Sequence, residues 1–333
     1  MRSFDTKPKK KKKGDDTPTL HIVDGSNWMC RAYFATQHAV PYLTAPDGTP
    51  TGGIKQFLNM VETLYAQTIR EETGSFIAIC FDPSSSDTWR YRAIQQWVGE
   101  NSKKFVRAVY VKSADYKGNR DRTKTSDLPI QMELSRKILD KAGFWICVKA
   151  PYEADDVVGT LSHRFSNMGY KVKLYSRDKD YVQLVDNPNV ELIMQKQANA
   201  PERRFTHKNV EEFVGVPANR ITHYLALAGD NADNVPGVPG IADGYAAKFI
   251  REYGSIKKFC LAAKTIKSTA KWKKALTGEL PMMDLALQLE LVTIDRNVPG
   301  LPKELEAFRV KESDDKYLKK MKKRLALRSI FHI

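Results

Sequence analysis

The sequence predicts an α/β protein: a central, mainly parallel sheet flanked by helices, followed by a smaller helical module. Between residue 19 and about residue 200, apolar runs of strand length alternate with helical patterns, which is typical of βαβ units. After about residue 205 the chain changes to short helices separated by glycine and proline. Several of the strand-like runs also end at an acidic residue, and in open parallel sheets the functional crevice lies at the carboxyl ends of the strands.

The N-terminal segment does not follow this pattern. Residues 1–18 are lysine-rich and of low complexity, and we expect them to be disordered. The lysine run fits a nuclear address, a nucleic-acid-binding arm or a solubility tail equally well, because such runs are common to all three.

Four predicted strands lead into acidic residues at the same end of the sheet. The strands are residues 20–23, 76–81, 144–148 and 172–175. The acidic residues that follow them are Asp24, Asp82, Glu153 and Asp178. Because the carboxyl ends of parallel strands meet at one edge, we expect these side chains to gather there.

The complete acidic set is larger and points to bound cations. Its members are Asp24, Asp82, Glu153, Asp155, Asp156, Asp178, Asp180, Asp230 and Asp233. Carboxylates this close would repel one another, and they hold together best around hard divalent cations such as Mg²⁺ or Mn²⁺. Two such ions can activate a water, stabilise a leaving oxygen and neutralise phosphoryl charge, so the set is suited to phosphodiester hydrolysis.

Spacing within the set adds detail. Glu153 and Asp156 are three residues apart at a predicted helix start, so they share a helix face. Asp155 points away from them by about a third of a turn and could reach an ion from the side. Asp230 and Asp233 repeat the three-residue spacing at the end of a later helix.

Residues 84–128 interleave aromatic and basic side chains. Examples are Trp89, Arg90, Trp97 and Lys104, with more of both kinds towards Lys124. This composition suits stacking on bases and contact with phosphates. The alternative is an amphipathic helix pair whose aromatics are simply core.

The later module carries a second nucleic-acid signal. Residues 221–228 are predicted to form a helix, and a loop over 229–240 leads to a second helix from about 241 to 253. Two helices joined by a glycine-bearing loop present free backbone N–H groups and a helix N-terminus, which together bind phosphate. Ordinary turn chemistry explains the PGVPG segment equally well.

Charge and composition set the protein class. The net charge is +15, of which residues 1–16 contribute +4 (seven basic and three acidic residues), so the body itself is basic. A basic body with its acids in one site suggests a bound polyanion, although a merely well-solvated basic protein has the same charge. Four scattered cysteines without CxxC spacing, and the lack of a signal-peptide core or a long apolar run, predict a cytoplasmic protein with reduced thiols.

Five segments in order carry a family resemblance. They are VDGSNWMCRAYFA (23–35), ADYKGNRD (114–121), YEADDVVGTL (152–161), SRDKDYVQLV (176–185) and LAGDNADNVPGVPGI (227–241). Together they resemble the 5′-nuclease family of bacteriophage 5′-exonucleases, flap endonucleases and the N-terminal 5′→3′ exonuclease domain of bacterial DNA polymerase I. The resemblance covers about residues 19 to 300, and the short remainder favours a free-standing nuclease of a phage or a bacterium.

The resemblance implies roles for individual residues. One metal position is lined by Asp24, Asp82, Glu153, Asp155 and Asp156, and the other by Asp178, Asp180, Asp230 and Asp233. Lys117 and Arg120 match the basic pair at the base of a helical arch, Tyr116 is placed to stack on the terminal base, and Arg31 matches a position near the scissile bond. In the helix–hairpin–helix the DNA-binding residues are Gly237, Val238, Gly240, Ile241 and Lys248.

Two departures from the family pattern stand out. Ala242 replaces a glycine in the hairpin, and Gly244 stands where a lysine is expected, with Lys248 one turn later as a substitute. The stretch from Asp82 to Tyr116 is also longer than in polymerase-associated relatives, which fits either a larger arch or a surface insertion.

The resemblance implies a PIN-like nuclease core over residues 19–204, with the arch region at 84–128. Residues 205–300 form the helix–hairpin–helix module, and 301–333 a basic extension whose apolar face at Leu318, Met321 and Leu325 docks on the body. The expected activity is that of a monomeric, two-metal 5′→3′ exonuclease and flap endonuclease in replication or repair. Its expected cofactors are Mg²⁺ or Mn²⁺, with K⁺ at the hairpin, and its substrates are DNA with 5′ ends, flaps or nicks, and RNA/DNA hybrids. The alternatives are a non-catalytic DNA-junction-binding protein and a PIN-type ribonuclease.

Overall fold

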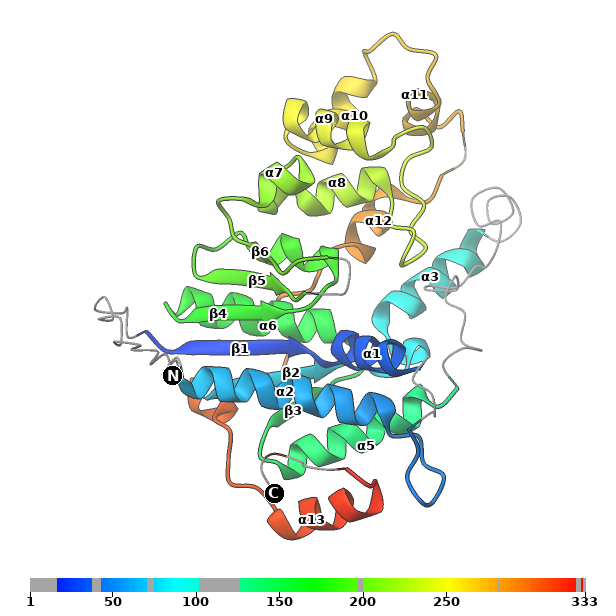
Figure 1. Cartoon of the computed structure of the whole chain (residues 1–333). Coiled ribbons are helices and arrows are strands. Elements are labelled where there is room, and N and C mark those ends of the chain that lie inside the picture. The colour runs from blue at the N-terminus through cyan, green and yellow to red at the C-terminus, as the bar shows by residue number, and fades with distance from the viewer. Residues whose placement is uncertain are drawn as a thin grey trace, which may run out of the picture.

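A six-stranded sheet forms the centre of the molecule (Figure 1). The computed structural model describes residues 17–37, 43–70, 75–101, 126–196, 200–280, 282–327 and 331. The strands are β1 (Thr19–Asp24), β2 (Phe76–Phe81), β3 (Trp145–Val148), β4 (Lys171–Tyr175), β5 (Val190–Met194) and β6 (Arg203–Phe205). Their order is β3-β2-β1-β4-β5-β6, and all neighbours are parallel except β5 and β6. The predicted mainly parallel sheet is therefore confirmed.

The central strands are apolar on both faces because helices cover both. All six residues of β1 and of β2 are buried. Along β2, Ile77, Ile79 and Phe81 face one core cluster, whereas Phe76, Ala78 and Cys80 face the other. This alternation follows from the two-residue period of a strand and explains why these runs read as continuously hydrophobic.

The helices divide between the two faces of the sheet. The helices of the α/β part are α1 (Gly25–Thr36), α2 (Gly52–Arg70), α3 (Trp89–Asn101), α5 (Leu128–Lys141), α6 (Ala154–Asn167) and α13 (Asp315–Arg324). Side chains of α1, α2, α5 and α13 make one core cluster with the sheet, and those of α3 and α6 belong to the other. Helix α3 leads away from the carboxyl edge of the sheet (Figure 1).

The helical module lies beyond β5 and β6 (Figure 1). It consists of α7 (Val210–Val214), α8 (Ile221–Ala228), α9 (Asp243–Tyr253), α10 (Ile256–Ala263), α11 (Lys271–Leu276) and α12 (Leu285–Leu291). Helix α8 has the predicted bounds, while α9 begins two residues later than predicted because Ala242 is its extended N-cap. Leu225, Ile250 and Phe259 share one apolar cluster with β1 and α6, so the module is continuous with the core.

The residues after position 300 return to the α/β part. Leu301, Leu305 and Phe308 are buried in its core, and Val310 N donates to Ser75 O at 2.9 Å next to β2. The predicted apolar face of α13 is confirmed, since Leu318, Met321 and Leu325 are all buried. Within the described ranges, no helix combines the length and the apolar composition needed to cross a membrane.

A carboxylate-rich candidate active site

A cavity of about 290 Å³ opens at the carboxyl edge of the sheet. Six of the nine predicted acidic residues line it: Asp24, Asp82, Asp155, Asp178, Asp180 and Asp233. The strand register explains why they meet. Asp24 pairs with Cys80 in β2, and Val23 pairs with Tyr175 in β4, so the three strands end side by side.

Asp24 is held at the end of β1 as the N-cap of α1. Its Oδ1 accepts from Asn27 N and its Oδ2 from Ser176 Oγ, both at 2.9 Å. Burial, followed by the nearby charge of Asp82, raises the pKa of this carboxyl from 3.8 to about 7. A larger residue than glycine would not fit at the next position, Gly25, without movement of its neighbours, because a Cβ there would lie 2.7 Å from the Phe81 ring.

Asp82 and Asp155 connect the end of β2 to the start of α6. Asp82 N donates to Ser26 Oγ at 2.8 Å, and Asp82 Oδ1 accepts from Ala154 N at 2.8 Å. Asp155 Oδ1 accepts from Asp156 N at 2.7 Å. The free backbone N–H groups of the first turn of a helix therefore orient both carboxylates beside the cavity.

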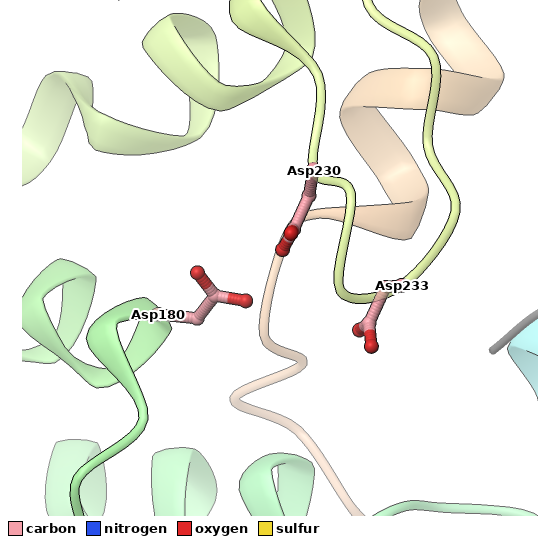
Figure 2. A group of neighbouring side chains, drawn as sticks. All are labelled: Asp180, Asp230 and Asp233. Carbon is pink, nitrogen blue, oxygen red and sulfur yellow. The ribbon is translucent and has the colours of Figure 1, made fainter. Parts of the chain in front are cut away.

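A second acidic group lies where the α/β part meets the loop after α8. Asp180 comes from the 3₁₀ helix Lys179–Leu184 after β4, whereas Asp230 and Asp233 come from the loop after α8 (Figure 2). One carboxylate oxygen of each lies within 4.8 Å of the others. We call these three residues the aspartate trio. The loop is shaped by reciprocal backbone hydrogen bonds between Asp230 and Val235, both 2.8 Å.

The aspartate trio has the properties of a cation site. Asp180 Oδ1 is buried and has no hydrogen-bond partner among the described residues. Burial and the charges of Asp178, Asp230 and Asp233 raise the pKa of Asp180 well above its usual range. All the ligand atoms are carboxylate oxygens, the type that hard divalent cations prefer, so the residues present fit such an ion.

Glu153 and Asp156 do not line the cavity, although the sequence grouped them with the acids that do. Both side chains are buried against Arg90, whose Nη1 lies 2.9 Å from Glu153 Oε2 and whose Nη2 lies 2.8 Å from Asp156 Oδ1. The carboxylate of Asp156 points into this buried network and not into the cavity. Arg90 itself is buried, so it is not part of a DNA-facing surface.

Arg31 lies on α1, one turn after the cavity-lining Asn27. Its guanidinium donates to Gln195 Oε1 at 2.5 Å and to Lys196 O at 3.1 Å. Arg177 donates to the carbonyl of the same Gln195 at 2.5 Å. Two cations are therefore held close together beside the acidic cavity. Burial and the charge of Arg177 lower the pKa of Arg31.

The hairpin between α8 and α9 is a tight turn that depends on two glycines. Gly237 and Gly240 have positive φ angles of 70° and 86°, and a Cβ on Gly237 would lie 2.5 Å from Gly229 N. Val238 and Ile241 are buried, so these residues anchor the turn through their side chains. Lys248 is exposed on α9. Tyr116, Lys117 and Arg120 lie outside the described residues.

Two family models together match most of the chain. The model described as 5′-3′ exonuclease, N-terminal resolvase-like domain, matches residues 19–215. The model described as 5′-3′ exonuclease, C-terminal SAM fold, matches residues 216–316. The chain belongs to the 5′-3′ exonuclease family.

Relatives of the 5′-3′ exonuclease family support the assignment. A 5′-3′ exonuclease of Aquifex aeolicus (strain VF5) is 32% identical over 94% of this chain and 93% of that protein. The DNA polymerase I of Caldicellulosiruptor bescii is 31% identical over 93% of this chain, which spans 33% of the polymerase. The expected resemblance is therefore confirmed.

Solved structures share the family fold. The T5 D15 protein, co-crystallised with metal ions, superposes with a TM-score of 0.60 at 18% identity, covering 84% of this chain and 89% of that one. The catalytic core of Rad2 in complex with a DNA substrate superposes with a TM-score of 0.55 at 14% identity, covering 93% and 88%. A further structure is titled as T5 5′-exonuclease with bound divalent metal ions (zinc).

Arg90 and Arg177 are the residues at this 5′-3′ exonuclease site whose roles sequence reasoning missed. Arg90 was placed among the aromatic and basic residues of 84–128, and composition alone could not show that it turns inward. Its position could have indicated a place near the site, since it follows the strand-end Asp82 by eight residues and lies at the start of a helix. Arg177 is adjacent to Asp178 in the sequence, and a cation next to a predicted ligand was a second usable signal.

Proposed function

We propose that this protein is a metal-dependent 5′→3′ exonuclease and structure-selective flap endonuclease that cleaves DNA in replication or repair and acts as a monomer. The observation that carries the proposal is the joining of two acidic groups around one cavity. Asp24, Asp82 and Asp155 come from the carboxyl edge of the sheet, Asp178 and Asp180 from the segment after β4, and Asp233 from the loop after α8. A protein that only bound DNA would gain nothing from six carboxylates facing a polyanion.

The two groups are suited to two divalent ions, Mg²⁺ or Mn²⁺. Asp24, Asp82 and Asp155, with Glu153 behind them, would hold one ion. Asp178 and the aspartate trio would hold the other. Bound ions of this kind lower the pKa of a coordinated water and stabilise the leaving oxygen of a phosphodiester.

The cations around the cavity would contact the substrate. Arg31 and Arg177 are fixed by Gln195 beside the acidic residues, and guanidinium groups bind phosphate oxygens in a defined orientation. From the sequence, Lys117 and Arg120 would stabilise phosphoryl charge, and Tyr116 would stack on the terminal base. Lys117→Ala should lower the single-turnover rate by about 10²-fold, the effect of removing one electrostatic stabiliser.

The helix–hairpin–helix would hold the duplex on one side of the cavity. Its backbone N–H groups around Gly237 and Gly240, with Lys248 on α9, would contact one strand, and K⁺ would bind at the same turn. A Cβ at Gly244 would meet no atom within 4 Å, so this exposed position is open for the substrate to approach. Suitable substrates are DNA with 5′ ends, flaps or nicks, and RNA/DNA hybrids.

One assay tests the proposed activity. A 5′-labelled flap, a nicked duplex and an RNA-primed duplex are incubated with Mg²⁺, Mn²⁺, Ca²⁺ or EDTA. We expect cleavage with Mg²⁺ or Mn²⁺, and binding without efficient turnover in Ca²⁺, whose looser coordination misplaces the reacting groups. Strong cleavage in EDTA, or tight flap binding without cleavage in every ion, would overturn the proposal.

A further inference from the structure

A buried guanidinium lies directly behind the acidic cavity. Arg90, in the first turn of α3, is 1% exposed. It donates to carboxylates at the start of α6 and to two backbone carbonyls in the segment that follows α12. The contacts are Glu153 Oε2 at 2.9 Å, Asp156 Oδ1 at 2.8 Å, Asp156 Oδ2 at 2.9 Å, Asp155 Oδ1 at 3.4 Å, Leu291 O at 2.9 Å and Thr293 O at 2.9 Å.

The number of donors matches these contacts. An arginine side chain has five N–H groups, and five of the contacts are 2.9 Å or shorter, with Asp155 as a longer sixth. A buried guanidinium with all its donors engaged has none left for a DNA phosphate. Arg90 therefore acts within the protein and not on the substrate.

The acceptor capacity of Asp156 is also used. Besides the two Arg90 bonds, its carboxylate accepts from Trp89 Nε1 at 2.9 Å, Glu153 N at 3.2 Å and Asp295 N at 2.9 Å. A carboxylate has about four lone-pair sites, and this one has five donors at 0% exposure. Direct binding of a metal ion would require several of these hydrogen bonds to break.

Asp155 and Asp156 are adjacent in sequence but differ in environment. Asp155 lines the cavity, and its contact with Arg90 is the long one, at 3.4 Å. Asp156 points into the core and forms a two-pronged ion pair with the same guanidinium. One side of the first turn of α6 is thereby fixed, and the other side is directed at the cavity.

We propose that Arg90 and Asp156 form a buried ion pair that positions Glu153 and Asp155 for ion binding, and that Asp156 is not itself a metal ligand. The inference rests on the proposed metal-dependent function. The planar fork of arginine fixes the first turn of α6 relative to α3 and to the segment at Leu291–Thr293. Its positive charge also offsets part of the repulsion among the carboxylates of Glu153, Asp155 and Asp156, so the three can lie close together.

The test measures ion binding without DNA and without turnover. Mn²⁺ affinity is measured by calorimetry or by electron paramagnetic resonance for the full-length wild type and for Arg90→Lys, Arg90→Met, Asp156→Asn and the double variant Arg90→Met/Asp156→Asn. Asp155→Asn serves as the direct-ligand comparison. We expect Arg90→Met and Asp156→Asn each to weaken Mn²⁺ binding by about 10- to 100-fold, the usual effect of removing a partner of a metal ligand. Arg90→Lys, which keeps the charge but loses the fork, should fall between wild type and Arg90→Met.

The double variant distinguishes an ion pair from two independent contributions. If Arg90 and Asp156 act as one pair, the double variant should bind Mn²⁺ about as well as the weaker single variant. If Asp156 were a ligand, its loss would add to that of Arg90, as the loss of Asp155 should in Arg90→Met/Asp155→Asn. Additive losses for Arg90 and Asp156 would therefore overturn the inference.

Melting temperatures of the variants show whether the Arg90–Asp156 pair positions the metal ligands or only stabilises the fold. Should Arg90→Met fail to fold, Arg90→Lys and Asp156→Asn carry the comparison. Variants that melt earlier but bind Mn²⁺ with wild-type affinity would show that the pair only holds the fold, and the inference would fail alone. Absence of Mn²⁺ binding by the wild type would overturn the proposed function and the inference with it.

Discussion

The two acidic groups at the cavity differ in how the protein supports them. At the sheet edge each carboxylate receives a donor from the chain: Asp24 from Asn27 N and Ser176 Oγ, Asp82 from Ala154 N, and Asp155 from Asp156 N. In the aspartate trio, Asp180 Oδ1 is buried with no donor among the described residues. An uncompensated buried acid is costly, so we expect Asp180 to depend on an ion more than the sheet-edge carboxylates do.

This difference separates two tasks. The sheet-edge acids are oriented by backbone N–H groups, by Ser26 and by Arg90, so we expect them to keep their geometry without an ion. The trio joins the α/β part to the loop after α8, so an ion there would also tie the helical module to the sheet. The comparison makes four predictions, from the largest expected effect to the smallest.

The largest effect should come from removing one acid of each group. Asp155→Asn and Asp180→Asn should each lower the single-turnover cleavage rate by about 10²- to 10³-fold or more, since each removes a preorganised charge from the reacting site. Flap affinity measured in Ca²⁺ should stay the same or improve, because a negative charge facing phosphate is neutralised. Asp140→Asn, an exposed acid on α5, is the control. Full activity in both site variants would show that the cavity is not catalytic.

The next largest effect should be the stabilisation of the fold by a bound ion, which should differ between the aspartate trio and the sheet-edge acids. Mg²⁺ at about 100 times its dissociation constant should stabilise the wild type by about 2.7 kcal/mol, seen as a rise in Tm. Asp230→Asn and Asp233→Asn should lose most of this gain. Without an ion, Asp180→Asn should melt above the wild type because it removes repulsion, whereas Asp155→Asn should not. Equal changes in Tm for Asp180→Asn and Asp155→Asn would contradict the difference between the two acidic groups.

The pH dependence of the ion-free protein should follow from the raised pKa of Asp24. Folding raises the pKa of this carboxyl from 3.8 to about 7. Between about pH 4 and about pH 7 the folded state therefore holds a proton that the unfolded state has lost. Stability measured in EDTA should therefore fall as pH rises from about 4 to about 7, by up to about 1.4 kcal/mol per pH unit for one group. The raised pKa of Asp180 acts in the same direction.

Substitution and ion addition both test this slope. Asp24→Asn should flatten it, and Mg²⁺ should oppose it because the ion favours the ionised carboxylates. Denaturant unfolding at a series of pH values, with and without EDTA, gives the slopes. A stability that rises between pH 4 and 7 in EDTA, with Asp24→Asn identical to wild type, would contradict the burial argument.

The smallest effect should come from the lysine at the rim of the trio. Lys179 Nζ lies 3.9 Å from Asp230 Oδ1, and its side chain is 64% exposed. Exposed pairs of this kind contribute about 0.2–1 kcal/mol. Lys179→Ala should tighten Mn²⁺ binding by at most about fivefold, because a competing cation is removed. Lys137→Ala is the control, and a loss of Mn²⁺ binding in Lys179→Ala would assign the lysine a structural role.

The sequence alone was sufficient for the elements with strong local signals. The run Phe76–Phe81 and the helix Ile221–Ala228 have their predicted bounds, because a continuous hydrophobic run and a glycine stop are local features of the sequence. Asp24, Asp82 and Asp178 line one cavity because parallel strands bring their carboxyl ends together. The apolar face of the predicted basic extension was also readable from the sequence, because Leu318, Met321 and Leu325 follow helical spacing, and all three are buried.

What only the tertiary structure decided is the direction of individual side chains. Asp155 and Asp156 are chemically identical and adjacent, yet one faces the cavity and the other pairs with Arg90. Residue type and strand order determined that acids collect at this edge. Which of them remain available for an ion depends on a guanidinium 63 to 66 residues away, and on carbonyls about 200 residues further along the chain. Such distant contacts leave no periodic trace in the sequence, because they form only when three separate segments pack together.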